Sequence, residues 1–479
     1  MGLDPKYIEE NLHVIGFKEA KSQLKEIIDN SSDLRLRKSA LEVFISIDND
    51  TNFKFFEHLF LSDENKEIRL RSGVILSENY KSDKHLLPLL EFCLYNIKDV
   101  DLKFYAIETL NNLDNKKSRK IIKEFLTTYI KLHLKEKKGE FPQEIFSSNN
   151  NNPLNWATLE TCFNLILHDY YVHECGYNVS LKNGIISALD CEGAKLEKLT
   201  EIQGLNKLNK LKYINLKRNN LRNINGIYHL KNLKHLDLTE NRIENIEYLE
   251  VLESLEELIL SSNYIKEIEN LVLPNLKELS LDHNNIDEIK NLDNLNNLVL
   301  LNLNHNNIKE IKSLENLENL RSLLLTDNVI EKISGLECLR NLRELYLNLN
   351  KITRIQGLGE LYNLKVLNLS NNAIERLENL SSLMNLTKFE LSSNRIKKIE
   401  GIEGLSKLKE FFVDKNRIER IEGLQGLENL IILFLENNFI TDFKPKDIES
   451  LKSLNFIFLN GNPLNEESRK YYHHKTRFP

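Results

Sequence analysis

Twelve asparagines recur in this sequence at a nearly constant interval. The steps are 22 residues, apart from one of 21 residues before Asn284 and one of 24 residues before Asn462. Self-similarity this regular indicates a stacked repeat, in which each unit buries its apolar face against its neighbours. The region is therefore predicted to fold as a solenoid. The asparagines are Asn219, Asn241, Asn263, Asn284, Asn306, Asn328, Asn350, Asn372, Asn394, Asn416, Asn438 and Asn462.

The repeat follows the template L-x-x-L-x-L-x-x-N-x-I-x-x-I-x-x-L-x-x-L-x-N, as in residues 298–319. Its first part alternates with period two, which is typical of a strand, and its second part has period three. Each unit is predicted to be one coil of strand, turn and 3₁₀-like limb. A coil that turns inward buries backbone N–H and C=O groups at its corner, and those groups need partners. An asparagine amide carries both donors and an acceptor, so one amide per coil can bridge neighbouring turns.

From Leu211 onward the chain resembles the 22-residue class of leucine-rich repeat, typified by a regulatory subunit of type-1 protein phosphatase. The pattern N-x-I-x-x-I-x-G-L-x-x-L-x-N, at residues 350–363 and 416–429, carries the resemblance. The resemblance covers about 270 residues of this sequence. It implies a parallel β-sheet on a concave face, 3₁₀ or irregular limbs on the convex face, and a surface that presents side chains to a partner.

The first third of the chain has a helical period instead. Basic fragments at Arg37, Arg71 and Lys103 recur in every second helix and follow acidic loops, which resembles HEAT-type helical repeats over residues 16–115. We expect these cations to join neighbouring hairpins through the acidic loops. The fold class is thus an α+β repeat protein, with an all-α HEAT-like solenoid before the leucine-rich solenoid. Helices are predicted at 17–29, 33–47, 53–61, 66–79, 84–96, 100–113, 116–134 and 154–167.

The predicted domain boundaries follow shifts in composition. A charged, glycine-, proline- and asparagine-containing stretch predicts a flexible linker. Asn183-Gly184 predicts a hairpin turn in the alternating residues 170–191, which we expect to cover the open strand edge of the solenoid. The predicted parts are a HEAT-like domain at 1–134, a linker at 135–153, a helix and hairpin cap at 154–185, leucine-rich repeats at 186–462 and a short C-terminal cap at 463–479.

Composition and motifs argue against several functions. The net charge of −6 argues against a general nucleic-acid binder. The sequence has no stretch long and apolar enough for a transmembrane helix and no signal-peptide pattern at its start, and its five scattered cysteines favour a reducing cytoplasm. Nucleotide-binding, zinc-protease and serine-hydrolase motifs are also absent. We therefore expect no catalytic residues, no metal, no cofactor and no enzymatic activity, and we expect a monomer.

A candidate binding site emerges from the residues that lie between the leucines of each predicted strand. Because adjacent strands are ~4.8 Å apart, residues one repeat apart should form rows. Large apolar side chains gather in the last repeats, whereas the earlier rows are mostly polar. Two alternatives stay open, namely that the tail from Arg469, with Tyr471, Tyr472 and Phe478, folds over this site, or that its exposure is incidental. The predicted partner-binding residues are Tyr346, Phe412, Ile432, Phe434, Phe456 and Phe458.

The sequence favours a non-catalytic scaffold that binds one or more proteins on its concave face, with the HEAT-like domain as a second binding module. The alternative is a regulatory subunit of a bound enzyme, either a phosphatase or a small GTPase. No nucleic acid and no membrane insertion are expected in either case.

Overall fold

The computed structural model describes residues 4–47, 52–133 and 156–475, so the predicted linker at 135–153 lies outside the described residues. The chain divides into two compact units. The first unit contains the chain up to Tyr170 together with residues 183–185, and the second contains residues 171–182 and everything from Ile186 onward. Every described helix is too short or too polar to cross a lipid bilayer.

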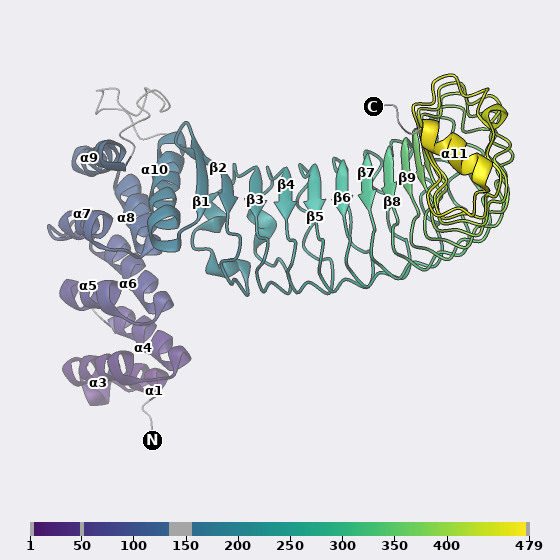
Figure 1. The fold of residues 1–479 in the computed structure, drawn as a ribbon. Helices are drawn as coiled ribbons and strands as arrows, with labels where there is room; N and C mark the ends of the chain where they lie inside the picture. The colour runs from purple at the N-terminus through teal and green to yellow at the C-terminus, as the bar shows by residue number, and fades with distance from the viewer. Residues whose placement is uncertain (1–3, 48–51, 134–155, 476–479) are drawn as a thin grey trace. The chain divides into compact units, whose positions relative to one another are not determined.

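The first unit is a stack of helical hairpins (Figure 1). In it α3 packs on α4, α5 on α6 and α7 on α8, and α10 contacts α8 and α9. The helices predicted at 66–79 and 100–113 have those bounds, and the other predicted ends lie within two residues of the observed ones. The first two helices were not predicted from the sequence. The helices are α1 (Pro5–Glu10), α2 (Leu12–Ile15), α3 (Phe17–Asn30), α4 (Leu34–Ile47), α5 (Phe53–Ser62), α6 (Lys66–Asn79), α7 (Leu86–Asn96), α8 (Val100–Leu113), α9 (Lys116–His133) and α10 (Trp156–Asp169).

Arginine–aspartate pairs join successive hairpins, as the acidic loops suggested. Arg37 on α4 pairs with Asp63, which follows α5. One hairpin later the forward pair is Arg69 with Asp99 at 2.7 Å. The prediction named Arg71 for this position and was wrong, because Arg71 reaches back to Glu42 on α4 at 2.6 Å.

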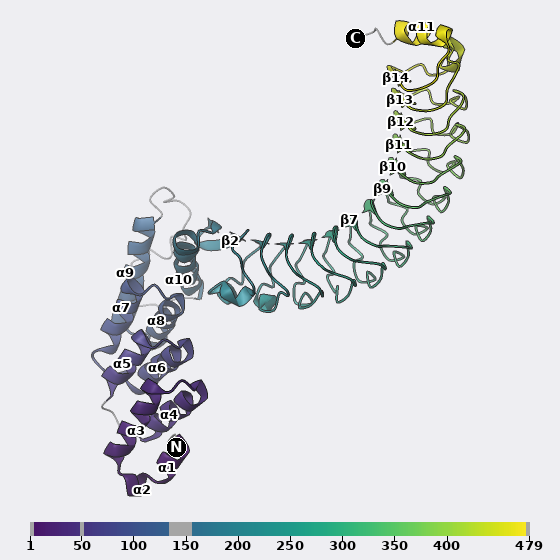
Figure 2. The same ribbon diagram turned by 60° about the horizontal axis from the view of Figure 1, so that its bottom comes forward.

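The second unit is a coiled solenoid whose strands form one 14-stranded sheet. From β2 onward each strand pairs in parallel with the next, and residues one repeat apart lie opposite each other. Figure 2 shows these strands along the inner side of the curve. The strands are β1 (Asn178–Lys182), β2 (Ile185–Asp190), β3 (Tyr213–Asn215), β4 (His235–Asp237), β5 (Glu257–Ile259), β6 (Glu278–Ser280), β7 (Leu300–Asn302), β8 (Ser322–Leu324), β9 (Glu344–Tyr346), β10 (Val366–Asn368), β11 (Lys388–Glu390), β12 (Glu410–Phe412), β13 (Ile432–Phe434) and β14 (Phe456–Phe458).

The hairpin at the start of the sheet is shorter than its alternating pattern predicts. Its first strand begins at Asn178, whereas residues Tyr170–Cys175 form a π-helical turn. The turn places the Tyr171 ring fully in the core. The Tyr171 hydroxyl donates a hydrogen bond to the carbonyl oxygen of Gln203 at 2.7 Å. Burial of this aromatic side chain with a satisfied hydroxyl outweighs the local strand pattern.

The repeated asparagine forms the expected ladder, and each amide bridges its own coil to the preceding one. In mid-stack the Oδ1 atom of Asn328 accepts from the N–H of Ile308 at 3.0 Å. Its Nδ2 atom donates to the carbonyl oxygen of Leu303 at 3.0 Å and to that of Leu325 at 3.2 Å. Asn328 is buried, so water cannot replace these bonds.

We expect Asn328→Ala to lower the free energy of unfolding by ~1–3 kcal/mol, because it leaves buried backbone groups without partners. Urea unfolding followed by circular dichroism measures this loss. Asn319→Ala is the matched control, since Asn319 is exposed and its side chain makes one hydrogen bond, to the carbonyl oxygen of Asn296 at 2.8 Å. Equal losses in the two variants would contradict a structural role for the buried ladder.

Each complete coil also has left-handed backbone at two places, of which only the second is marked in the repeat pattern, by its glycine. The residue before each ladder asparagine has positive φ, for example Asp327 at 55°. A second such residue lies seven positions after the ladder asparagine, as at Asn379 and Gly423. Glycine and asparagine adopt this conformation most easily, which explains their recurrence at the second place.

A C-terminal helix, α11 (Glu466–Lys475), closes the last strand edge. The N–H of Leu459 on the final coil donates to the Tyr472 hydroxyl at 3.1 Å. The N–H of Phe443 donates to the hydroxyl of Ser468 at 2.8 Å, and both Tyr472 and Ser468 are buried. The helix therefore supplies partners that a further coil would otherwise provide.

Candidate functional site

The concave face of the sheet takes two side chains from each short strand. In β13 the middle residue, Leu433, is fully buried, while Ile432 and Phe434 on either side of it are partly exposed. This alternation follows from the period-two geometry of a strand. The parallel register then aligns these exposed positions from strand to strand.

Three phenylalanines form a column across the last three strands. The rings of Phe412 and Phe434 stack with their centroids 4.8 Å apart, and those of Phe434 and Phe458 stack at 4.1 Å. In the neighbouring row Ile432 lies opposite Phe456, whose side chain is 48% exposed. The structure thus brings together five of the six predicted site residues. We call Phe412, Ile432, Phe434, Phe456 and Phe458 the aromatic patch.

Tyr346, the sixth predicted residue, lies in the same row as the phenylalanine column but on β9, three strands before Phe412. Partial burial raises the pKa of its phenol above the usual value, and Glu344 contributes to the shift. Asn368 and Glu390 occupy the row between Tyr346 and the column. Tyr346 is therefore separated from the aromatic patch by polar side chains.

Polar side chains that the sequence analysis did not assign to the site border the patch. Asn368 donates to Glu390 at 2.7 Å, and Lys388 pairs with Glu390 at 2.7 Å. The hydrogen bond that Lys388 donates to Glu390 raises the pKa of Lys388. The ammonium group of Lys388 also lies 5.4 Å from the centroid of the Phe412 ring, within the range of a cation–π contact. A charged rim beside an apolar centre is the usual anatomy of a protein interface.

The alternative that the tail covers the site is resolved in part. Tyr472 packs on the strand edge and Tyr471 lies against Phe443, with ring centroids 5.3 Å apart. Phe456 nevertheless keeps its exposure. The described part of the tail therefore closes the end of the sheet and leaves the patch accessible, while Phe478 lies outside the described residues.

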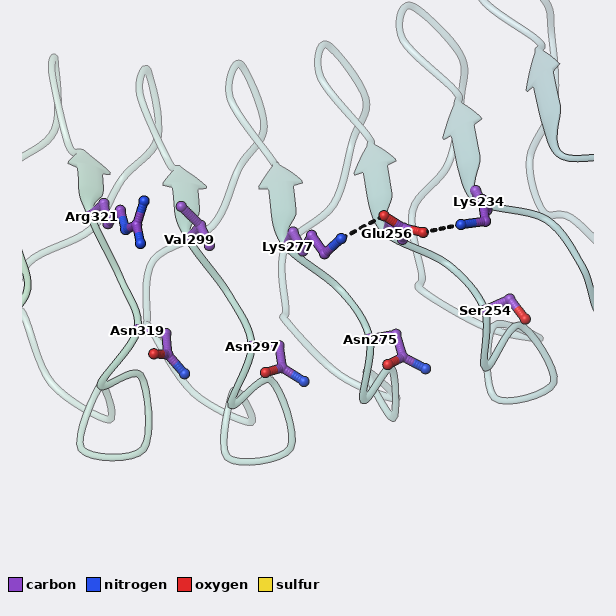
Figure 3. A pocket seen from close by; sticks show the side chains of 9 residues that line it. All are labelled: Lys234, Ser254, Glu256, Asn275, Lys277, Asn297, Val299, Asn319 and Arg321. Carbon is purple, nitrogen blue, oxygen red and sulfur yellow. Dashed lines mark hydrogen bonds and ion pairs between the residues drawn. The ribbon is translucent and has the colours of Figure 1, made fainter.

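A groove of about 570 Å³ follows the edge of the concave sheet further back in the stack. Figure 3 shows its two walls, a row of mainly charged side chains and a row of three asparagines that ends at Ser254. In the charged row Glu256 pairs with Lys234 and, at 2.7 Å, with Lys277. These hydrogen bonds lower the pKa of Glu256 to about 2.

The asparagine wall is a second amide ladder, at the last position of the repeat template. Asn297 donates to the carbonyl oxygen of Pro274 at 2.8 Å, and Asn319 donates to that of Asn296 at 2.8 Å. Unlike the buried ladder, these residues are exposed. Both walls occupy fixed positions of the template, since the charged row follows its first leucine and the asparagine is its last residue.

Family models of leucine-rich repeats match parts of the second unit. A model of two leucine-rich repeat copies matches residues 253–294 and 340–382. A further leucine-rich repeat model matches residues 406–464. No curated protein matches the chain.

Several solved structures resemble the chain. An internalin from Listeria monocytogenes is 32% identical over 58% of this chain and 82% of its own, with a TM-score of 0.54. A leucine-rich repeat protein from Leptospira interrogans is 28% identical over 59% of this chain and 80% of its own, with a TM-score of 0.49. The APL1 leucine-rich repeat domain is 20% identical over 56% of this chain and 73% of its own, with a TM-score of 0.50. The repeat matches and the identity and coverage of the internalin establish that this chain belongs to the leucine-rich repeat family.

Proposed function

We propose that the chain is a non-catalytic scaffold that binds a protein partner on its concave face, with the aromatic patch at the centre of the contact. The patch itself carries the proposal. An aromatic side chain removes ~150–250 Å² from water when it is buried. Phe456 is 48% exposed and the other four residues of the patch are partly exposed, so they form a contiguous apolar surface on one face, a feature that marks interaction sites.

The residues around the patch support the same proposal. Binding hot spots are rich in aromatic side chains and are surrounded by contacts that exclude water. Lys388 and Glu390 border one end of the patch, and their charges would form a polar rim. Leucine-rich repeat domains generally bind proteins, which agrees with this use of the surface.

The helical unit, whose hairpins resemble HEAT repeats, is proposed as a second binding module. Its exposed Tyr7, Val14 and Phe17 support this role. A reducing cytoplasm is proposed as the location, because Cys338 carries an exposed thiol. The proposal involves neither nucleic acid nor membrane insertion, and it treats the scaffold as a monomer. The alternative function, a regulatory subunit, applies if the bound partner is an enzyme.

Site-specific photo-crosslinking tests which face binds. A photoreactive benzoylphenylalanine replaces Ile432 on the concave face, and in a control variant it replaces Lys398, which is exposed outside the strands. We expect irradiation in an extract of the natural source cells to give a discrete protein adduct at position 432 that is at least tenfold weaker at position 398. Mass spectrometry of the adduct then identifies the partner and tells whether it is an enzyme. Stronger adducts at position 398, or none at 432, would refute the proposal.

A further inference from the structure

Cations dominate one row along the edge of the concave sheet, at the residue after the first leucine of the repeat. Seven of the ten positions from Lys212 to Lys409 are lysine or arginine, although these residues make up only 65 of 479 in the chain. We call these seven residues the basic stripe. The ten positions are Lys212, Lys234, Glu256, Lys277, Val299, Arg321, Arg343, Lys365, Thr387 and Lys409.

Backbone hydrogen bonds hold the stripe in register. The N–H of Arg321 donates to the carbonyl oxygen of Val299, that of Arg343 to Arg321, and that of Lys365 to Arg343, each at 2.8 Å. Consecutive positions of the row are therefore fixed one strand spacing apart, which is ~4.8 Å. Their side chains are exposed. The charges thus form an ordered line on the surface.

The two ends of the stripe differ in how far their charge is neutralised. In the earlier coils Lys234 and Lys277 share the carboxylate of Glu256. Among the described residues, no ion pair joins Arg321, Arg343, Lys365 or Lys409 to a carboxylate. Figure 3 shows this change along the groove, from the paired lysines to Arg321. Lys212, at the far end of the stripe, has no ion pair among the described residues either, so four of the five uncompensated cations lie in the coils that lead to the aromatic patch.

We propose that the concave face recognises an acidic amphipathic α-helix of its partner, with carboxylates on the basic stripe and an apolar end on the aromatic patch. One turn of an α-helix rises ~5.4 Å, close to the ~4.8 Å between strands. Alternate residues of an extended peptide are ~6.6 Å apart and would lose this register faster. Long arginine and lysine side chains absorb the remaining difference. The row continues into Ile431, which precedes Ile432 of the patch, so the charged row ends beside the apolar residues.

The site favours an acidic protein segment over nucleic acid. Bases bind single-strand sites by stacking on aromatic faces. Here Phe434 is stacked on both sides, by Phe412 and Phe458, and the Phe412 face opposite Phe434 is approached by Lys388. The chain is also acidic overall, with a net charge of −6. The carboxylates on one side of a helix can all bind a single line of cations. The phosphates of a nucleic-acid strand are expected to contact a broader basic surface.

The inference rests on the proposed function and is tested with the full chain. The probes are two fluorescent, lactam-stapled helical peptides with one glutamate per turn. One carries a Leu-Phe pair at its N-terminal end and the other carries the pair at its C-terminal end. Each has a counterpart with glutamine in place of glutamate. Binding is followed by fluorescence anisotropy. The stripe variant is Arg321→Gln, Arg343→Gln, Lys365→Gln and Lys409→Gln. The matched variant removes the same charge from exposed positions that follow the ladder asparagines, away from the stripe, through Lys309→Gln, Lys332→Gln, Lys397→Gln and Arg420→Gln.

We expect one of the two glutamate peptides to bind at least tenfold more tightly than its glutamine counterpart. The stripe variant should lose at least tenfold in affinity for it, and the matched variant should lose less than threefold. Raising NaCl from ~0.1 M to ~1 M, which shortens the Debye length from ~10 Å to ~3 Å, should weaken binding to the unmodified chain far more than to the stripe variant.

Equal binding of the glutamate and glutamine peptides, or no binding of either, would overturn the inference. So would tighter binding of a single-stranded oligothymidylate than of the glutamate peptide. The crosslink at position 432 separates the two proposals. If its yield is undiminished in the stripe variant, the concave face still binds a protein but the acidic-helix inference fails. If the adduct is missing from the otherwise unmodified chain, the proposed function itself fails.

Discussion

Replacing Gly423 with alanine is expected to destabilise the leucine-rich repeat unit by roughly 2–5 kcal/mol, the sum of a left-handed backbone penalty and overpacking. Gly423 has φ of 72°. A β-carbon at this position would overlap the backbone carbonyl oxygen of Ile399 in the preceding coil. The obstacle is backbone within the stack, so no flexible side chain can move aside to relieve it.

Gly401→Ala is the matched control for this prediction. Gly401 occupies the same position of the repeat with nearly the same φ, 70°, but its added β-carbon would lie 3.3 Å from the carbonyl oxygen of Leu377. We expect a loss of only ~1–2 kcal/mol, mainly from the backbone conformation, because a small shift of the Leu377 carbonyl accommodates the β-carbon. The free energies come from urea unfolding, supported by amide hydrogen exchange in the coils around Ile399. If the two variants lose equal stability, the close approach at Gly423 has no energetic consequence.

The repeat itself could be predicted from sequence because its features are local and periodic. The ladder asparagine, the strand leucines and the limb isoleucines each have a fixed register, so their burial followed from the template. The helix bounds followed from apolar periodicity in the same way. The aromatic patch was predictable too, since parallel strands in register place residues one repeat apart side by side.

Features that depend on tertiary partners were missed. The sequence from Glu466 is short and polar, and its helix is held by contacts such as the hydrogen bond that the N–H of Leu459 donates to the Tyr472 hydroxyl. The π-helical turn at Tyr170–Cys175 depends on burial of Tyr171. The choice of Arg69 over Arg71 for the forward ion pair depends on how neighbouring hairpins dock. The basic stripe was also missed, but for a different reason. Its residues occupy one position of the repeat, so it could have been found from the sequence alone.

The double substitution Phe412→Ser and Phe434→Ser is expected to weaken partner binding at least tenfold, which is ~1.4 kcal/mol. The two rings stack on each other, and both are partly exposed on the concave face. Burying them against a partner would contribute much of the apolar contact. Each stacked pair contributes ~0.5–1.5 kcal/mol within the free protein, so we expect the melting temperature to fall by only a few degrees.

The matched control substitutes two aromatic side chains outside the concave strands, Tyr264→Ser and Phe439→Ser, which are also exposed. It should retain both the melting temperature and partner binding.

The most direct test of the central claim is the dissociation constant of the crosslink-identified partner for these two variants and the unmodified chain, measured by isothermal titration calorimetry. The account predicts at least a tenfold rise for the Phe412 and Phe434 variant and less than a twofold change for the control. Unchanged affinity after loss of both phenylalanines, in a variant that remains folded, would contradict the aromatic patch as the binding site.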